Sequence, residues 1–134
     1  MTKPDYRRLD IWYVRLDPTE GREAQKRCDP ASAQDARERA PRRTRPCLVL
    51  QNDLGNKYSD VTIIAPFLEP KKYPFVVIVE PSATNGLDRE RGLNLSQMRV
   101  VAYSRFVSKL GVLESHYNPL IDRAISIELS LFDN

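Results

Sequence analysis

The sequence predicts a mainly β (α+β) fold, an antiparallel barrel or half-barrel with one helix at its C-terminal end. About six short segments rich in β-branched and aromatic residues are separated by turn residues, as is typical of small antiparallel sheets. Near the end of the chain the apolar spacing becomes helical, which indicates an amphipathic helix. A chain of 134 residues predicts a single domain, residues 1–134.

The expected strands are separated by recognisable turns. They cover residues 9–16, 46–52, 61–68, 75–80, 93–101 and 107–113. The segment Asn52–Asn56, which contains Gly55, predicts a turn after the second strand. The segment 93–101 alternates regularly, so that Gln97 and Arg99 are expected on one face of a single strand.

The terminal helix is predicted to begin at Asn118, a good N-cap, with Pro119 in the first helical position. Its apolar stripe is expected to consist of residues at helical spacing, Leu120, Ala124, Ile127 and Leu131, joined by Ile121 and Ile125.

Composition limits the class of protein. The chain is 41% hydrophobic, enough for a small core, and it has no apolar run long enough for a membrane span. Its N-terminal residues are polar and charged, unlike a signal peptide. We therefore expect a soluble, cytoplasmic protein without a membrane partner.

Cysteine and histidine are too few for a metal cluster. Cys47 lies in an apolar run and is expected to be a buried, inert thiol, whereas Cys28 lies among charges and is expected to be exposed. The single histidine, His116, precedes the terminal helix and is expected to cap it or to lie at the surface. We expect no metal and no cofactor.

The positive charge is local. The net charge is +3, but residues 22–45 hold eight Lys or Arg and four acids, which leaves −1 for the rest of the chain. This basic segment lies in a polar stretch, residues 19–44, that is long for a loop in a small domain. A polyanionic partner and a merely solvated, charge-rich loop both account for it.

Four segments, taken in order, resemble the MazF/PemK family of toxin endoribonucleases. They are Asp10-Ile-Trp-Tyr-Val-Arg-Leu-Asp-Pro18 with Gly21-Arg-Glu23, Arg45-Pro-Cys-Leu-Val-Leu-Gln-Asn-Asp53 with Gly55-Asn-Lys-Tyr-Ser59, Leu95-Ser-Gln-Met-Arg99, and the segment from Asp122 to Leu131. The resemblance runs from about Arg8 to Phe132 and is interrupted by a basic insertion at about residues 24–42.

The resemblance implies an SH3-like barrel that forms a homodimer with an RNA groove across it. It implies a metal-independent, sequence-selective endoribonuclease toxin that cleaves single-stranded RNA (mRNA) through attack of the 2′-OH on the adjacent phosphate. It also implies a cognate, MazE-like antitoxin, with which the toxin could bind operator DNA.

The same resemblance assigns the candidate site residues. Arg45, directly before a proline, matches the family's catalytic arginine, and Glu23 matches a glutamate that serves as general base or reads a base. Leu68 stands where the family usually has a catalytic Thr or Ser. The candidate RNA-binding residues are Gly21, Arg22, Arg43, Tyr58, Gln97 and Arg99.

Two departures keep alternative functions open. Leu68 cannot donate a hydrogen bond, and Ser96 replaces an acid that often precedes the groove glutamine. The basic turn at Lys71 and Lys72 either compensates by contacting phosphate or is simply solvated. The alternatives are a catalytically weakened member that binds RNA, antitoxin or operator DNA, and a gyrase poison of similar fold. The insertion is expected to form a mobile basic flap at the groove mouth, which either strengthens RNA capture or blocks the groove until RNA or antitoxin orders it.

Overall fold

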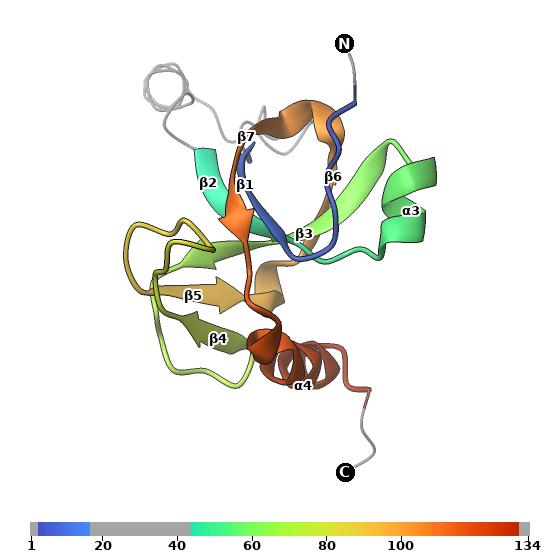
Figure 1. Ribbon diagram of the computed structural model, residues 1–134. Helices are drawn as coiled ribbons and strands as arrows, with labels where there is room; N and C mark the ends of the chain where they lie inside the picture. The colour runs from blue at the N-terminus through green and yellow to red at the C-terminus, as the bar shows by residue number, and fades with distance from the viewer. Residues whose placement is uncertain (1–2, 17–43, 132–134) are drawn as a thin grey trace, which may run out of the picture.

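The computed structural model describes residues 3–16 and 44–131 (Figure 1). Seven strands occur in these residues: β1 (Asp10–Arg15), β2 (Thr44–Val49), β3 (Val61–Leu68), β4 (Val76–Val79), β5 (Arg91–Asn94), β6 (Arg99–Ala102) and β7 (Phe106–Val112). The helices are α3 (Asp53–Tyr58) and α4 (Asn118–Glu128), with 3₁₀ turns η2 (Leu95–Gln97), η3 (Tyr103–Arg105) and η4 (Ser115–Tyr117).

The strands form one antiparallel sheet in the order β4-β5-β3-β2-β1-β7, and β6 pairs with β3 beside β5. The sheet is strongly curved. The helix α4 lies close to β4, and α3 lies beside the start of β3 (Figure 1). The predicted antiparallel, barrel-like architecture with a C-terminal helix is therefore confirmed, and strands were expected close to the positions of β1, β2, β3, β4 and β7.

The prediction of one continuous strand over residues 93–101 is wrong. The chain turns at η2, where the Asn94 side chain accepts a hydrogen bond from the Ser96 backbone N–H at 3.0 Å. This turn lets β5 pair with β3 near Phe67 while β6 pairs with β3 from Val61 to Ile64. The alternation of side chains continues through residues 95–97, so the sequence pattern did not indicate the turn.

The predicted turn at Asn52–Asn56 is also wrong, because the chain forms the short helix α3 there. Asn52 is its N-cap, with a side chain that accepts from the Gly55 backbone N–H at 2.8 Å. A Cβ atom at Gly55 would lie 2.9 Å from the flexible Gln51 side chain, which would have to shift to make room for it. The Lys3 ammonium group donates to the Ser59 carbonyl at 2.6 Å and to that of Asn56, which satisfies the C-terminal end.

Each face of the central sheet contributes to a core. Leu48 and Phe67 belong to the larger core, and the sequence neighbours of Leu48, Cys47 and Val49, belong to the smaller one together with Ile64. Side chains that alternate along a strand point to opposite faces, which explains why β2 and β3 contain continuous apolar runs.

The terminal helix begins where it was predicted, but its cap differs. The first helical residue is Asn118 itself, and the residue before it, Tyr117, makes no side-chain cap. Instead, the Asn118 side chain accepts a hydrogen bond from Arg8 Nη1 at 3.3 Å. Proline in the first turn is confirmed.

The predicted apolar stripe of the terminal helix is half confirmed: Ile121, Ala124 and Ile125 pack on the larger core, and the other three residues do not. Ile121 and Ala124 are the buried residues, 0% and 2% exposed, whereas Leu120 and Leu131 are 51% and 64% exposed. Ile127 is also exposed, at 37%. Two sets of apolar residues in this segment have helical spacing, and only the set that contains Ile121 packs against the larger core.

His116 is exposed, as expected, and its ring lies 4.3 Å from that of Tyr117. In the part of the chain that the structure describes, no helix is long and apolar enough to cross a membrane.

Candidate functional site

Arg45 lies at the edge of the smaller core. It stands on β2 opposite Val14 of β1, and both residues share a sheet face with Cys47. Val14 and Cys47 are fully buried, whereas the Arg45 side chain is exposed. No ion pair engages its guanidinium group within residues 3–16 and 44–131.

Arg99 lies on the same sheet face. It stands on β6 opposite Ile64, and Val101, two residues further along, belongs to the smaller core. The half-buried Arg99 side chain donates from Nη1 to the Leu16 carbonyl oxygen at 3.5 Å. This bond connects the start of β6 to the end of β1.

The charges of both guanidinium groups act on the buried Cys47 thiol. Burial raises the pKa of Cys47 to about 12, and the charges of Arg99 and Arg45 both act in the opposite direction. The two cations therefore lie near the same buried sulfur atom. The predicted inert thiol is confirmed, because Cys47 is 0% exposed and unpaired.

We call the sheet surface that carries Arg45 and Arg99 the arginine face. Leu68 belongs beside it. Cys47 pairs with Pro66 of β3, the last paired position, and Arg45 and Leu68 each lie two residues beyond it along their strands, on the same sheet face. Leu68 is half-buried and pairs with Gly92 of β5 on its other side. Its side chain adds carbon but no hydrogen-bond donor to the arginine face.

Gln97 and Ser96 are exposed in η2. Because this turn interrupts the strand, Gln97 does not share a strand face with Arg99, contrary to the prediction.

Tyr58 was predicted in a loop, but it is the last residue of α3 and is 75% exposed. The Lys57 ammonium group lies 5.3 Å from the centre of its ring. Tyr58 lies before the first residue of β3, and Leu68 is the last residue of β3. The two residues are therefore at opposite ends of this eight-residue strand (Figure 1). One subunit therefore does not bring Tyr58 to the arginine face.

Some predicted site residues lie outside the described residues. They are Gly21, Arg22, Glu23 and Arg43, together with the insertion at about 24–42.

Sequence reasoning missed Arg105, which donates from Nη1 to the Arg15 carbonyl oxygen at 3.0 Å. Arg99 and Arg105 thus hold successive carbonyls at the end of β1. No motif in the sequence distinguishes Arg105 from other surface arginines.

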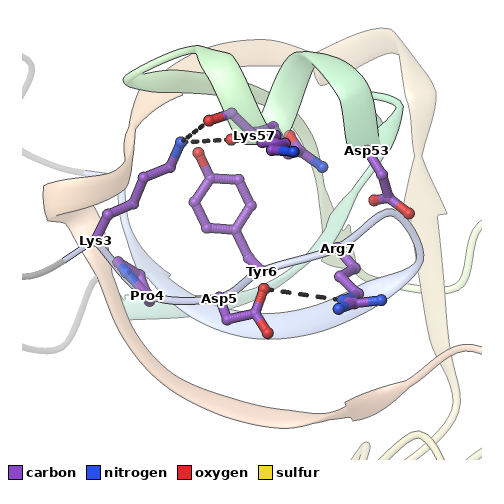
Figure 2. Close-up of a pocket in the computed structure, with 8 residues that line it drawn as sticks. Lys3, Pro4, Asp5, Tyr6, Arg7, Asp53 and Lys57 are labelled. Atoms are coloured by element: carbon purple, nitrogen blue, oxygen red, sulfur yellow. Dashed lines mark hydrogen bonds and ion pairs between the residues drawn. The ribbon is translucent and has the colours of Figure 1, made fainter.

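A cavity of about 550 Å³ lies between residues 3–7 and α3 (Figure 2). Its walls carry charges of both signs: it is lined by Lys3, Pro4, Asp5, Tyr6, Arg7, Asp53, Asn56 and Lys57. None of the predicted site residues lines it, so we place the functional site on the arginine face. Among the described residues, no three His, Cys, Asp or Glu side chains come together in a way that could hold a metal ion.

The family model of the PemK-like, MazF-like toxins of type II toxin–antitoxin systems matches residues 7–129. The chain belongs to this family. The resemblance carried by its four sequence segments is thereby confirmed. Endoribonuclease EndoA of Bacillus subtilis is 32% identical over 92 residues, 66% of this chain and 78% of EndoA. Endoribonuclease MazF of Staphylococcus saprophyticus is 34% identical over 90 residues, 65% of this chain and 74% of the relative.

Solved MazF structures share the fold. Toxin MazF-mt6 of Mycobacterium tuberculosis superposes with a TM-score of 0.67 at 16% identity, covering 92% of this chain and 99% of that one. A mycobacterial endoribonuclease in complex with its cognate antitoxin gives a TM-score of 0.66 at 15% identity, covering 96% and 99%. MazF from Deinococcus radiodurans gives 0.65 at 18% identity, covering 95% and 98%.

Proposed function

We propose that this MazF/PemK-family toxin is a sequence-selective endoribonuclease that cleaves single-stranded mRNA in the cytoplasm without a metal ion. Two curated relatives of more than 30% identity are endoribonucleases, and the family model covers nearly the whole chain. The observation that carries the proposal is the exposed Arg45 guanidinium, which lies on one face with Arg99 and has no described acidic partner. We treat residues 1–134 as one toxin domain with a basic insertion at about 24–42.

The arginine face suits cleavage in which RNA supplies its own nucleophile. The 2′-oxygen forms a bond to phosphorus, the bond from phosphorus to the 5′-oxygen breaks, and a 2′,3′-cyclic phosphate and a 5′-hydroxyl result. One proton leaves the 2′-OH and another reaches the departing 5′-oxygen. Arg45 stabilises the extra negative charge on the phosphoryl oxygens, because its planar guanidinium presents several donors and stays charged at neutral pH.

Proton transfer needs a further group. A guanidinium is a poor proton shuttle because of its high pKa. Glu23 remains the candidate general base, assigned by its match to the family motif and not by any contact. Gly21, Arg22, Arg43, Gln97 and Tyr58 remain candidate RNA contacts in the same sense.

A cognate antitoxin and a second subunit complete the proposed assembly. The solved mycobacterial endoribonuclease is a complex with its antitoxin, which supports such a partner for this chain. Ile63 of β3 and Val100 of β6 stand opposite each other and are 36% and 59% exposed, an apolar surface that a second subunit can cover. A monomeric mass in sedimentation at micromolar concentration would contradict the homodimer.

Cleavage of a long RNA in the presence of EDTA tests the proposed activity. We expect discrete cuts at a short motif, with 5′-hydroxyl ends, and a loss of at least ~100-fold in rate for Arg45→Ala. Arg15→Ala is the matched control, because Arg15 is an exposed arginine opposite Thr44, one position out of register with Arg45 and thus on the other face. Cuts that persist in Arg45→Ala would exclude this arginine from catalysis.

Leu68 supports a second candidate, a catalytically weakened toxin that retains RNA or antitoxin binding. By the family resemblance a Thr or Ser hydroxyl is expected at this position, and Leu68, on the sheet face of Arg45, supplies none. RNA that stays intact but binds with unchanged affinity would favour this candidate over an active nuclease.

A further inference from the structure

The loop between β3 and β4 presents a rigid pair of aromatic rings at the surface. The rings of Tyr73 and Phe75 are 5.2 Å apart between centroids and inclined by only 8°, so they are stacked. Tyr73 is 51% exposed, whereas Phe75 is half-buried behind it. One face of the tyrosine ring is therefore supported by Phe75, and the other remains available to solvent.

Backbone hydrogen bonds fix this pair. The Tyr73 carbonyl accepts from the Val76 N–H at 3.0 Å, and the Tyr73 N–H donates to the Lys71 carbonyl at 3.2 Å. The Phe75 carbonyl accepts from the Leu95 N–H at 2.9 Å, at the first residue of η2. The pair is thus held against the turn that carries Gln97, and its loop starts directly after Leu68. A ring that is already ordered loses little conformational freedom when a ligand stacks on it.

Charge next to the rings has the sign that suits RNA. Lys71 and Lys72 are exposed and precede Tyr73 directly in the chain. Alternation of stacking rings and backbone-binding cations is the general chemistry of single-stranded nucleic-acid binding. The acid of this loop, Glu69, forms an ion pair with Arg89 at 2.7 Å, and this contact lowers the pKa of Glu69. The positive charge of Arg89 offsets the repulsion between the Glu69 carboxylate and an RNA phosphate.

We propose that the Tyr73–Phe75 pair is a nucleobase-stacking site, in which one unpaired base of the RNA substrate lies on the outer face of Tyr73 while Lys71 and Lys72 contact the adjoining phosphates. This inference rests on the proposed endoribonuclease function. It adds a base subsite beside η2 to the proposed phosphate contacts of the arginine face.

The test measures binding of a short RNA that spans the mapped cleavage site and carries one 2′-deoxy nucleotide at the attacking position, so that it cannot be cut. Tyr73→Ala is expected to weaken binding by about 5- to 100-fold, the range typical of losing one stacked base. Tyr73→Phe keeps the ring and is expected to bind within about twofold of wild type. Thermal unfolding of each variant checks the fold, and Tyr73→Leu serves as a second ring-free variant.

Abasic substitution identifies the stacked base. At one nucleotide position, removing the base should weaken binding to the wild type but not to Tyr73→Ala, because both changes remove the same stacking interaction. In a salt titration, Lys71→Gln and Lys72→Gln should each flatten the logarithmic dependence of affinity on salt, by about 0.7 for each phosphate that is no longer neutralised. Arg123→Gln, at an exposed arginine on α4, is the matched control and should leave the slope unchanged.

The outcomes separate the two proposals. If the wild type neither cleaves nor binds RNA, the nuclease function itself fails. If the wild type cleaves but Tyr73→Ala binds as tightly as wild type, only the stacking site is overturned, and the exposed pair is then a surface for a protein partner. Equal losses in Tyr73→Phe and Tyr73→Ala would also overturn it, since the hydroxyl and not the ring would then bind the RNA.

Discussion

Replacing Leu68 by threonine tests whether the arginine face lacks one hydrogen-bond donor. Leu68 ends β3 and lies on the sheet face of Arg45, two residues beyond Pro66, the β3 partner of Cys47. A hydroxyl at this position would point to the same face as the Arg45 guanidinium and reach a phosphoryl oxygen bound there. The change therefore adds the donor that the family motif normally contains.

The expected gain follows from what a single donor contributes. Loss of one preorganised donor to a developing oxyanion typically slows a reaction by ~100-fold or more, so restoring one in imperfect geometry should accelerate single-turnover cleavage by at least ~10-fold. The cost in folding stability should be small. Full burial of a leucine side chain contributes about 1.5–3 kcal/mol, and Leu68 is only half-buried, so Thr should lower the free energy of unfolding by about 1 kcal/mol. Threonine also suits a strand.

Leu68→Val is the matched control, because valine has the shape of threonine without the hydroxyl. The assay compares single-turnover cleavage of one RNA by the wild type and both variants, with thermal unfolding to match their stability. The gain in Leu68→Thr should disappear when Arg45→Ala is also present, since the two groups act on the same phosphate. Equal rates for Leu68→Thr and Leu68→Val would refute the reasoning, because the hydroxyl would then contribute nothing.

Two further predictions concern the cores beneath the site. Burial raises the pKa of Cys47 to about 12, so the folded protein should take up at most one thiol label per chain at pH 8 and the unfolded protein two, as counted by mass spectrometry. Because the pKa of Cys47 is higher in the folded than in the unfolded chain, its contribution to stability is fully present at pH values below the unfolded-state pKa and is lost as the pH rises toward 12. Labelling of Cys47 in the native protein would contradict its burial. Ile121→Ala should lower the free energy of unfolding by about 2–5 kcal/mol, because Ile121 is fully buried under the sheet, whereas Leu120→Ala, at a residue 51% exposed, should lower it by much less in denaturant titration. Equal losses at the two positions would contradict the observed orientation of α4.

Local pattern predicted the strands well and their interruptions poorly. Residues 61–68 form a strand with the predicted bounds, because one face of β3 is buried along nearly its whole length and the other from Ala65 to Phe67. The break at η2 depends on a side chain, Asn94, that accepts from the backbone two residues on. Alternating hydrophobicity carries no information about such a turn.

The helix α3 shows the converse case. Asn52 and Gly55 suggested a turn, yet the same asparagine caps a helix, since capping and turn formation use the same side-chain acceptor. What decides between them is tertiary: the Lys3 ammonium group, 53 residues away in sequence from Asn56, satisfies the carbonyls at the helix end. No window along the chain contains that contact.

The candidate site was predictable only in part, for a related reason. Family motifs identified Arg45 and Arg99 one by one, but their common face follows from strand register, which pairs β6 and β2 with the two edges of β3. The expected strand face shared by Gln97 and Arg99 failed at the η2 turn. The Tyr73–Phe75 stack was not predicted, because it depends on the turn closed by the Val76 N–H and the Tyr73 carbonyl, which the sequence pattern did not indicate.

Pairing with an acid sets Arg91 on the same sheet apart from Arg45 and Arg99 as a phosphate-binding group. Arg91 on β5 is bound to Asp88 at 2.9 Å, a contact that raises the pKa of Arg91 and lowers that of Asp88, so binding phosphate there would first require breaking an ion pair. Arg99 donates one N–H to a neutral carbonyl, and Arg45 has no ion-pair partner among the described residues. Both also border the buried Cys47, where a low dielectric on one side strengthens attraction to an anion. A cation that is unpaired and anchored at the edge of a core is already arranged for the charge that develops during phosphodiester cleavage.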